Sequence, residues 1–182
     1  MKVIFLDFDG VLNSEQSFNF WSHKRDQKKW ETEMYEQWKG TLYEYLAFEF
    51  CPIACSNVEE LMRRVPDAKI VVSSTWRLNN DVPVLKEILK PFKLITDAII
   101  DVTPNIRITP RGAEIQAWLD KHPEVTEFVI LDDDSDMLHL TDHFVHTSGL
   151  HGFLFGDMLK ALKILKVQDK YTGSSYDPTR LD

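Results

Sequence analysis

Residues 2–12 of the chain read KVIFLDFDGVL. After Lys2 the run is apolar up to Leu6, and two aspartates and a glycine follow at once. This pattern predicts a short buried strand over residues 2–6 that ends in a polar turn. Asp7 and Asp9 then lie at the carboxyl end of that strand.

The remaining sequence alternates between strand and helix patterns. Further strands are predicted at residues 69–72, 94–100, 127–131 and 144–146. Helical patterns fall between them at residues 58–64, 84–90, 111–121 and 158–165. Alternation of this kind predicts an α/β fold with a doubly wound, Rossmann-like parallel sheet, and such sheets bind ligands beyond the carboxyl ends of their strands.

The length of 182 residues suits one domain, predicted over residues 1–167 with a polar tail at 168–182. More than 60 residues separate the first two strands, which predicts a small, mainly helical cap inserted at about residues 13–50. Trp30, Met34 and Trp38 share one helical face there. The basic, aromatic run at 23–30 either contacts a nucleic-acid strand or forms a solvated helix face.

Net charge, apolar run length and cysteine spacing disfavour further classes of function. The chain carries 29 acidic and 21 basic residues, a net charge of −8, which disfavours non-specific nucleic-acid binding. No apolar run is long enough for a membrane span. Cys51 and Cys55 fit neither a zinc-ribbon nor a thioredoxin spacing, so both are expected to be reduced thiols. A soluble, cytoplasmic protein with no membrane contact and no obligatory protein partner is expected.

Two acidic clusters follow predicted strands. Asp7 and Asp9 are two residues apart, so in extended backbone their carboxylates share a side, an arrangement that a cation such as Mg²⁺ would relieve. Residues 132–136 read DDDSD and follow the strand FVIL. They do not match an EF-hand, because the glycine and glutamate of that loop are missing.

The segment SSTWR at residues 73–77 follows the second strand. Ser73 and Ser74 could hold a phosphoryl oxygen or cap the next helix. Arg77 could grip a second phosphate or pair with a structural carboxylate. Gly10, Ser74 and Arg77 are the expected substrate-binding residues.

Residues 109–115, TPRGAEI, predict a helix start with Thr109 as the N-cap. Arg111 then lies at the positive end of the helix dipole, which an anion nearby would explain. We assign Arg111 to the phosphate and the acidic cluster, with Lys121 as the fallback; a surface arginine paired with Glu114 is the simpler alternative.

Several enzyme classes lack their motifs. The six histidines show no zinc-ligand spacing, and no serine-hydrolase elbow is present. No glycine-rich phosphate-binding loop of the Walker or dinucleotide type is present either, so the sequence shows no motif for binding ATP or NAD.

FLDFDGVL, IVVSS and FVILDDDSD resemble the first, second and fourth motifs of the haloacid dehalogenase (HAD) superfamily of phosphohydrolases. The resemblance implies Asp7 as nucleophile, Asp9 as general acid/base and Ser73 as the phosphate-holding hydroxyl. It also implies an Mg²⁺ site, for which we expect Asp7, Asp9, Asp132 and Asp133.

Two positions depart from the family pattern or leave it open. The third motif usually carries a lysine, where this chain offers Arg111 or Lys121. The fourth motif selects either Asp132 with Asp136 or, as we prefer, Asp132 with Asp133.

LDFDGVLN, KIVVSSTWR and VILDDDSDM more narrowly resemble the phosphatase-like domain of RNA-repair (Swiss Army Knife) proteins. The implied activity is an Mg²⁺-dependent phosphomonoester hydrolase acting through an aspartyl-phosphate, with a phosphorylated small molecule or a nucleic-acid 3′ end as substrate. Aspartate at position 9 favours phosphoryl transfer over dehalogenation, because a halide needs no proton. The alternatives are a non-catalytic phosphate-binding module and a phosphotransferase or mutase.

Overall fold

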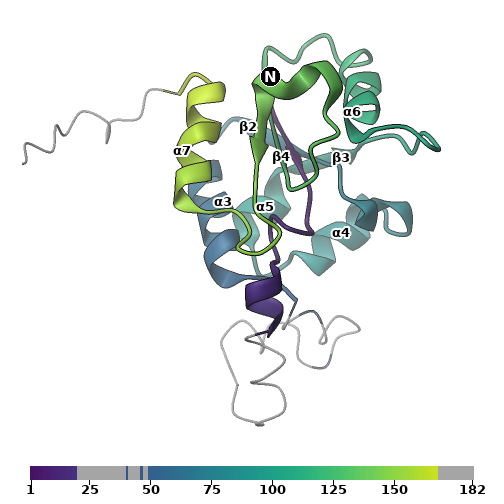
Figure 1. Cartoon of the computed structure of the whole chain (residues 1–182). Coiled ribbons are helices and arrows are strands. Elements are labelled where there is room, and N and C mark those ends of the chain that lie inside the picture. Colours follow the sequence, from purple (N-terminus) through teal and green to yellow (C-terminus); the bar gives the residue numbers. More distant parts are fainter. Residues whose placement is uncertain (20–39, 41–45, 47–48, 168–182) are drawn as a thin grey trace, which may run out of the picture.

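The computed structural model describes residues 1–19, 40, 46 and 49–167 (Figure 1). Most of the predicted cap at 13–50 and all of the predicted tail at 168–182 lie outside the described residues. The same holds for Trp30, Met34, Trp38 and the basic run at 23–30.

A parallel sheet forms the centre of the described chain (Figure 1). Its strands are β1 (Lys2–Leu6), β2 (Ala68–Val72), β3 (Ile99–Val102), β4 (Glu127–Asp132) and β5 (Phe144–His146). They are ordered β3-β2-β1-β4-β5, and every neighbouring pair is parallel. The predicted doubly wound α/β fold is therefore confirmed.

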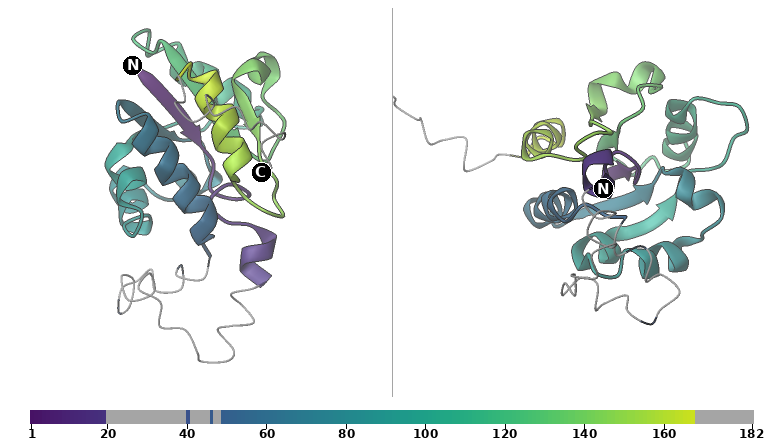
Figure 2. Two further views of the ribbon diagram at one scale, coloured as in Figure 1. Left: turned by 90° about the vertical axis from the view of Figure 1, so that its left-hand side faces the viewer. Right: turned by 60° about the horizontal axis from the view of Figure 1, so that its bottom comes forward.

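Helices cover both faces of the sheet. They are α3 (Pro52–Arg64), α4 (Val82–Ile88), α5 (Lys93–Ala98), α6 (Arg111–Leu119) and α7 (Phe155–Ile164), with short 3₁₀ turns η2 (Thr75–Leu78) and η3 (Leu138–His143). The right-hand view of Figure 2 shows α3 and α7 side by side on one side of the sheet and α6 on the other. α3 begins six residues earlier than predicted, because Pro52 is well suited to the first turn of a helix.

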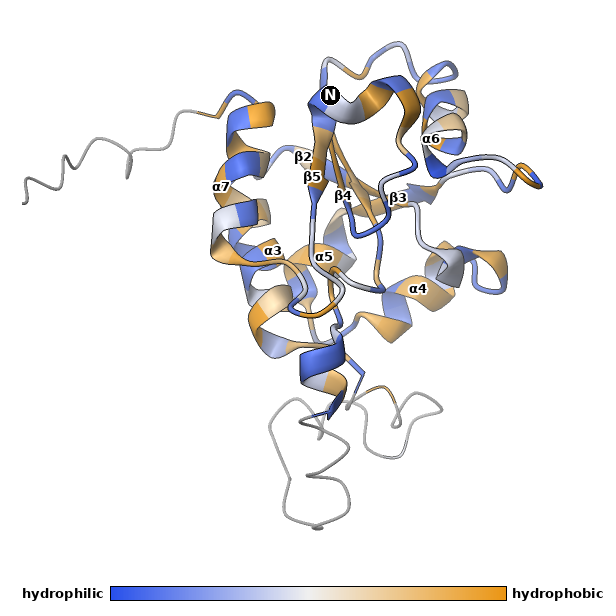
Figure 3. Ribbon diagram, viewed as in Figure 1, coloured by the Kyte–Doolittle hydropathy of each residue, from blue (hydrophilic) through white to orange (hydrophobic). Residues whose placement is uncertain are grey.

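The alternation of side chains along each strand produces two apolar cores. Ile4 and Leu6 of β1 point to the core beneath α3, α4, α5 and α7. Val3 and Phe5 point to the core beneath α6 and η3. The strands are therefore apolar on both faces, as the mostly orange ribbons at the centre of Figure 3 show.

The strand predicted at residues 94–100 is wrong over most of its length. Residues 93–98 form α5, and β3 begins only at Ile99. Phe92, Ile95 and Ala98 are buried three residues apart, so the apolar positions follow a helical period and pack on one face. A short apolar run does not distinguish a buried strand from a helix by itself.

Within the described part of the chain, no helix has both the length and the hydropathy that a membrane span requires.

Helix α6 packs unusually closely on the segment after β4. A Cβ on Gly112 would lie 2.4 Å from the carbonyl oxygen of Met137. The Gly112 N–H also donates to the Asp136 carbonyl at 3.2 Å. Glycine at this position therefore sets how near the start of α6 lies to β4.

We expect Gly112→Ala to lower the free energy of unfolding by about 1–3 kcal/mol, because the added methyl group meets backbone that must shift. Helix propensity alone predicts the opposite sign. Urea denaturation measures the change. Gly156→Ala in α7 is the matched control, since a methyl group there would have no other atom within 4 Å. It should raise stability by about 0.5–1 kcal/mol; equal effects of the two substitutions would contradict this account.

Candidate active site

Strand register brings three predicted site residues to one level. Leu6 pairs with Val72 on one side and with Leu131 on the other, so the next residue of each strand lies at the same edge. These next residues are Asp7, Ser73 and Asp132, at 4%, 0% and 0% exposure. Residues from distant parts of the sequence are thereby adjacent and shielded from water.

Three carboxylates gather at this edge. Oxygen atoms of Asp7, Asp132 and Asp133 all lie within 4.8 Å of one another. Asp7 Oδ1 accepts from the Phe8 N–H at 2.7 Å, and Asp132 Oδ1 accepts from the Asp134 N–H at 2.9 Å. Each of these two carboxylates therefore keeps its Oδ2 for another partner.

Arg111 lies beside both of those atoms. Its Nη1 is 3.2 Å from Asp7 Oδ2 and 3.2 Å from Asp132 Oδ2, and it also donates to the Ser73 carbonyl. Burial lowers the pKa of Arg111, but the charges of Asp7 and Asp132 outweigh it and raise the pKa above the usual value. The sequence assignment of Arg111 to the acidic cluster agrees with this position, whereas Glu114 pairs with Arg77 instead.

Lys121 does not share the position of Arg111. It follows the carboxyl end of α6, where its N–H donates to the Trp118 carbonyl, and it lines a different cavity, of about 350 Å³, beside β3. Lys121 therefore does not replace Arg111 at the carboxylates.

The electrostatics of the cluster favour a bound cation. Burial first, and then the charge of Asp7, raise the pKa of Asp132 to about 8, against the opposing effect of Arg111. The same two causes raise the pKa of Asp133. Asp132 Oδ2 is buried, and apart from its ion pair with Arg111 it has no partner among the described residues. Crowded, desolvated oxygen donors of this kind fit Mg²⁺.

The Asp9 carboxylate lies outside this cluster, so the structure does not bring it together with the other three predicted metal ligands. β1 ends at Leu6 and the chain turns at Phe8, whose carbonyl accepts from the N–H groups of Val11 and Leu12 at 3.2 and 2.8 Å. The side-sharing rule for residues two apart holds only in extended backbone. The exposed Asp9 carboxylate instead contacts Trp76 and Asn13.

Gly10 makes room for Asp133. Its φ is +68°, and a Cβ there would lie 2.2 Å from Asp133 Cγ. The Gly10 N–H donates to Asn13 Oδ1 at 2.9 Å, and its carbonyl accepts from Thr147 Oγ1 at 2.8 Å. Since both backbone groups have protein partners, Gly10 shapes the site and does not offer them to a substrate.

The two serines of the second motif differ. Ser73 Oγ is buried and has no hydrogen-bond partner among the described residues, so it can receive a ligand oxygen. Ser74 Oγ accepts from the Trp76 N–H at 3.4 Å and caps η2. Of the two alternatives left open for these hydroxyls, the structure therefore shows capping for Ser74.

Arg77 is buried within the scaffold, which corrects its predicted place among the substrate contacts. Its Nη2 pairs with Glu114, its Nε donates to the Thr103 carbonyl at 2.9 Å, and its Nη1 donates to the Ser73 and Ser74 carbonyls at 3.0 and 2.8 Å. The side chain is only 4% exposed. Of its two predicted roles, pairing with a structural carboxylate is the one observed.

Asp136 holds the start of α6 and lies outside the three-carboxylate group. Its Oδ2 accepts from the Arg111 N–H at 2.8 Å. Helix α6 begins at Arg111 with Pro110 as its N-cap, and Thr109, the predicted cap, donates to the Ile106 carbonyl instead. Asp132 with Asp133 is thus the pair that the structure brings together with Asp7.

Sequence analysis missed three residues that contact the predicted ones: Asn13, Trp76 and Thr147. Asn13 lies within four residues of Asp9 and Gly10, so its contact with them had a local signal in the sequence, whereas Trp76 lies 67 residues from Asp9 and had none. Thr147 lies 137 residues from Gly10, and nothing local in the sequence indicates their contact.

The raised pKa of Asp132 predicts a pH dependence of stability in protein freed of metal with EDTA. The unfolded chain loses this proton near pH 3.8, whereas the folded protein keeps it to about 8. The folded state thus binds more protons over this interval, so the free energy of unfolding should fall as the pH rises through it. Urea denaturation from pH 5 to pH 8 measures the slope.

Asp132→Asn should flatten that slope, because the amide stays neutral while its Oδ1 still accepts from Asp134. Asp97→Asn, at an exposed position on α5, is the control and should keep the wild-type slope. An unchanged slope in Asp132→Asn would show that this carboxylate does not carry the effect.

Comparison with solved structures agrees with this fold. The HAD domain of effector protein Lem4 from Legionella pneumophila has a similar structure, with a TM-score of 0.51 and 18% identity over 91% of this chain and 96% of that one. An inactive mutant of that domain matches with the same score and identity over 95% of its length. At 18% identity this likeness shows the fold alone.

A search of curated proteins finds no match. A family model, the HAD domain of Swiss Army Knife RNA repair proteins, matches residues 3–155. With its acidic strand ends in one cluster and the family match spanning most of its length, the chain belongs to this family of HAD domains.

Proposed function

We propose that the protein is an Mg²⁺-dependent phosphomonoester hydrolase that uses Asp7 as its nucleophile. The observation that carries the proposal is the meeting of Asp7, Asp132 and Asp133 with Arg111 and the unpartnered Ser73 hydroxyl at one edge of the sheet. Carboxylates, a guanidinium and a free hydroxyl together suit a phosphoryl group.

The residues divide the reaction into two displacements. An Asp7 oxygen forms a bond to phosphorus, the bond from phosphorus to the ester oxygen breaks, and Asp9 gives the departing oxygen a proton. Water then attacks the aspartyl-phosphate, Asp9 takes the proton of that water, and inorganic phosphate leaves with Asp7 restored. Two easier steps thus replace one difficult hydrolysis.

Ser73 and Arg111 bind the phosphoryl oxygens in this proposal. Ser73 Oγ is an unused donor beside the nucleophile, and the Arg111 guanidinium already lies 3.2 Å from Asp7 Oδ2. Both groups are fixed before the substrate arrives, so they can stabilise the charge that develops on the transferred group.

Asp7, Asp132 and Asp133 would hold the magnesium ion. When bound, it supplies positive charge that offsets repulsion between these carboxylates and the substrate phosphate. Hard oxygen donors favour Mg²⁺ over zinc or copper.

For the substrate, a polynucleotide 3′-phosphate end stands as a more specific proposal within this activity. The matched family takes its name from RNA repair proteins, and the basic, aromatic run at 23–30 could contact a strand. The net charge of −8 argues instead for a smaller phosphate ester.

The first test measures phosphate release from p-nitrophenyl phosphate in Mg²⁺. We expect Asp7→Asn to lower kcat by at least about a thousandfold, as expected for loss of a nucleophile, and EDTA to abolish release from the wild type. Asp97→Asn removes an exposed aspartate of α5, which directly precedes β3 and so lies at the opposite end of that strand from the site, and should keep wild-type activity.

Phosphate release that persists in Asp7→Asn would exclude an aspartyl-phosphate route. A folded, Mg²⁺-bound wild type that releases no phosphate from small or polynucleotide esters would favour the non-catalytic binding module. Transfer of the phosphoryl group to another acceptor without phosphate release would favour the phosphotransferase.

The second test compares substrates. If a polynucleotide end is the substrate, kcat/KM should be at least about tenfold higher for a 3′-phosphorylated RNA oligonucleotide than for p-nitrophenyl phosphate, a preference worth about 1.4 kcal/mol. The same oligonucleotide with a 5′-phosphate is the matched control. Faster turnover of the small ester than of the 3′-phosphorylated oligonucleotide would overturn the polynucleotide proposal and leave the hydrolase proposal standing.

A further inference from the structure

Two side chains hold the Asp9 carboxylate. Trp76 Nε1 lies 3.2 Å from Asp9 Oδ1 and 3.0 Å from Oδ2, so its N–H donates to both oxygens. Asn13 Nδ2 donates to Oδ1 at 2.8 Å. An exposed carboxylate would otherwise rotate freely in water.

The indole of Trp76 is itself firmly placed. Its rings lie 5.5 Å from Phe8 and 5.8 Å from Phe50, centroid to centroid. The Trp76 N–H of the main chain donates to Ser74 Oγ, and its carbonyl accepts from Asn80 Nδ2 at 2.8 Å. An aromatic ring packed in this way can act as a rigid donor, because it has few rotatable bonds to fix.

Asn13, in the segment after β1, is the second side chain that holds the Asp9 carboxylate. Its Oδ1 accepts from the Gly10 N–H at 2.9 Å, which fixes the amide plane so that Nδ2 faces Asp9. Trp76 follows β2 and Asn13 follows β1, so the Asp9 carboxylate is held from two sides. The Asp9 carboxylate is not one of the three that gather at Asp7, Asp132 and Asp133.

We propose that Trp76 is a positioning residue of the reaction, whose indole N–H orients Asp9 toward the departing ester oxygen. The inference rests on the proposed function, in which Asp9 protonates that oxygen. The proton passes from Asp9 to the ester oxygen as the bond to phosphorus breaks, and Trp76 only orients the carboxyl group. Efficient transfer needs the two oxygens within hydrogen-bond reach, so a misplaced carboxyl slows this step.

The dependence of the rate on the leaving group separates a positioning role from a structural one. A purely structural defect would slow all esters alike. An alkyl ester releases a strongly basic alkoxide and depends on protonation as it departs. 2,4-Dinitrophenyl phosphate releases a weakly basic phenolate that leaves without a proton. Loss of orientation at Asp9 should therefore slow the alkyl ester and spare the dinitrophenyl ester.

The test compares kcat/KM for glycerol phosphate and 2,4-dinitrophenyl phosphate in wild type and Trp76→Phe. Phenylalanine keeps an aromatic ring against Phe8 and Phe50 but lacks the N–H. We expect kcat/KM to fall about 10- to 100-fold for the alkyl ester, below the full contribution of a general acid, and to change little for the dinitrophenyl ester. Asp9→Asn should show the same selectivity with a larger loss.

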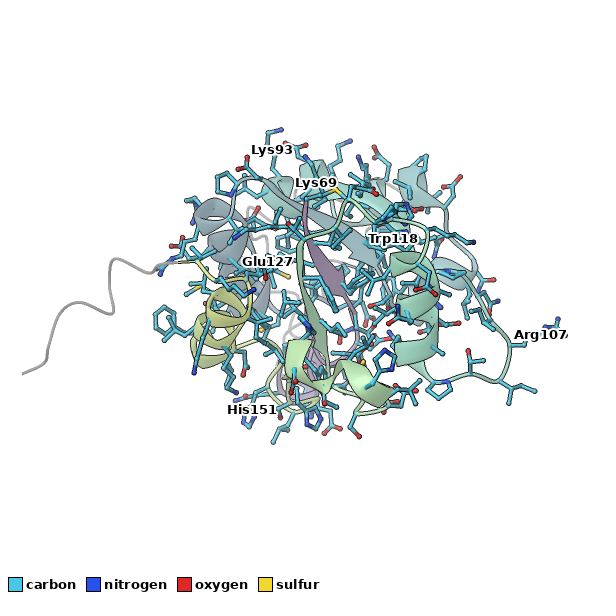
Figure 4. The ribbon with its side chains drawn as sticks, turned by 90° about the horizontal axis from the view of Figure 1, so that it is seen from above. Lys69, Lys93, Arg107, Trp118, Glu127 and His151 are labelled. Carbon is cyan, nitrogen blue, oxygen red and sulfur yellow. The ribbon has the colours of Figure 1, made fainter. Side chains whose placement is uncertain are left out.

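Trp118→Phe is the matched control. The Trp118 indole also donates to a carboxylate, Asp101 Oδ2 at 2.7 Å, but Trp118 lies on α6 and Asp101 lies on β3. Figure 4 shows Trp118 between that helix and the sheet, away from the exposed Arg107. This variant should change stability without changing the ratio of the two kcat/KM values. Asn13→Ser, which removes the second donor and leaves the indole, supports the inference by the same selectivity if Trp76→Phe fails to fold.

Four results would overturn the inference. Equal losses on both esters in Trp76→Phe would show a structural role only, and unchanged rates would show no role; either result leaves the hydrolase proposal intact. A wild type that hydrolyses neither ester, or an Asp9→Asn variant without leaving-group selectivity, would overturn the general-acid role of Asp9 and this inference with it.

Discussion

Two buried carboxylates, Asp7 and Asp132, lie side by side because β1 and β4 are parallel and in register. Neither can move away without breaking the ladder, where the Asp7 N–H donates to the Leu131 carbonyl at 3.0 Å. Like charges held in a desolvated place repel each other strongly. The Arg111 guanidinium offsets part of this repulsion, and a divalent cation held by the carboxylates would offset the remainder. The repulsion that burdens the fold would thus also favour the binding of a cation between these carboxylates.

A second buried ion pair connects the strand ends to α6. Arg77 pairs with Glu114 of α6 and binds carbonyls at the ends of β2 and β3. Glu114 Oε1 also accepts from the Ile106 N–H at 2.9 Å, which fastens the loop before α6. Buried charges are tolerated when hydrogen bonds satisfy them, as they do here. Because Arg111 lies in the first turn of α6, the Arg77–Glu114 pair also fixes the position of the Arg111 guanidinium, which contacts Asp7.

The site combines a rigid, buried half with an exposed half. Asp7, Ser73 and Asp132 are set by the sheet, with their positions fixed by strand register. Asp9 lies beyond the end of β1, in a turn, and depends on side chains for its orientation. This division matches the chemistry proposed for each part, since the nucleophile and the cation need fixed geometry, whereas the proton donor must reach the ester oxygen of an incoming substrate.

The sequence by itself determined the sheet, its alternation with helices, and the residues at three strand ends, because apolar runs and the polar residues after them are local patterns. It also indicated Arg111, through a cation placed at the start of a helix. Only the tertiary structure decided that Asp9 stands apart, that Arg77 faces Glu114, and that residues 93–98 are helical. These outcomes depend on contacts between residues such as Trp76 and Asp9, 67 positions apart, and a local pattern carries no information about which distant side chain will satisfy a given hydrogen bond.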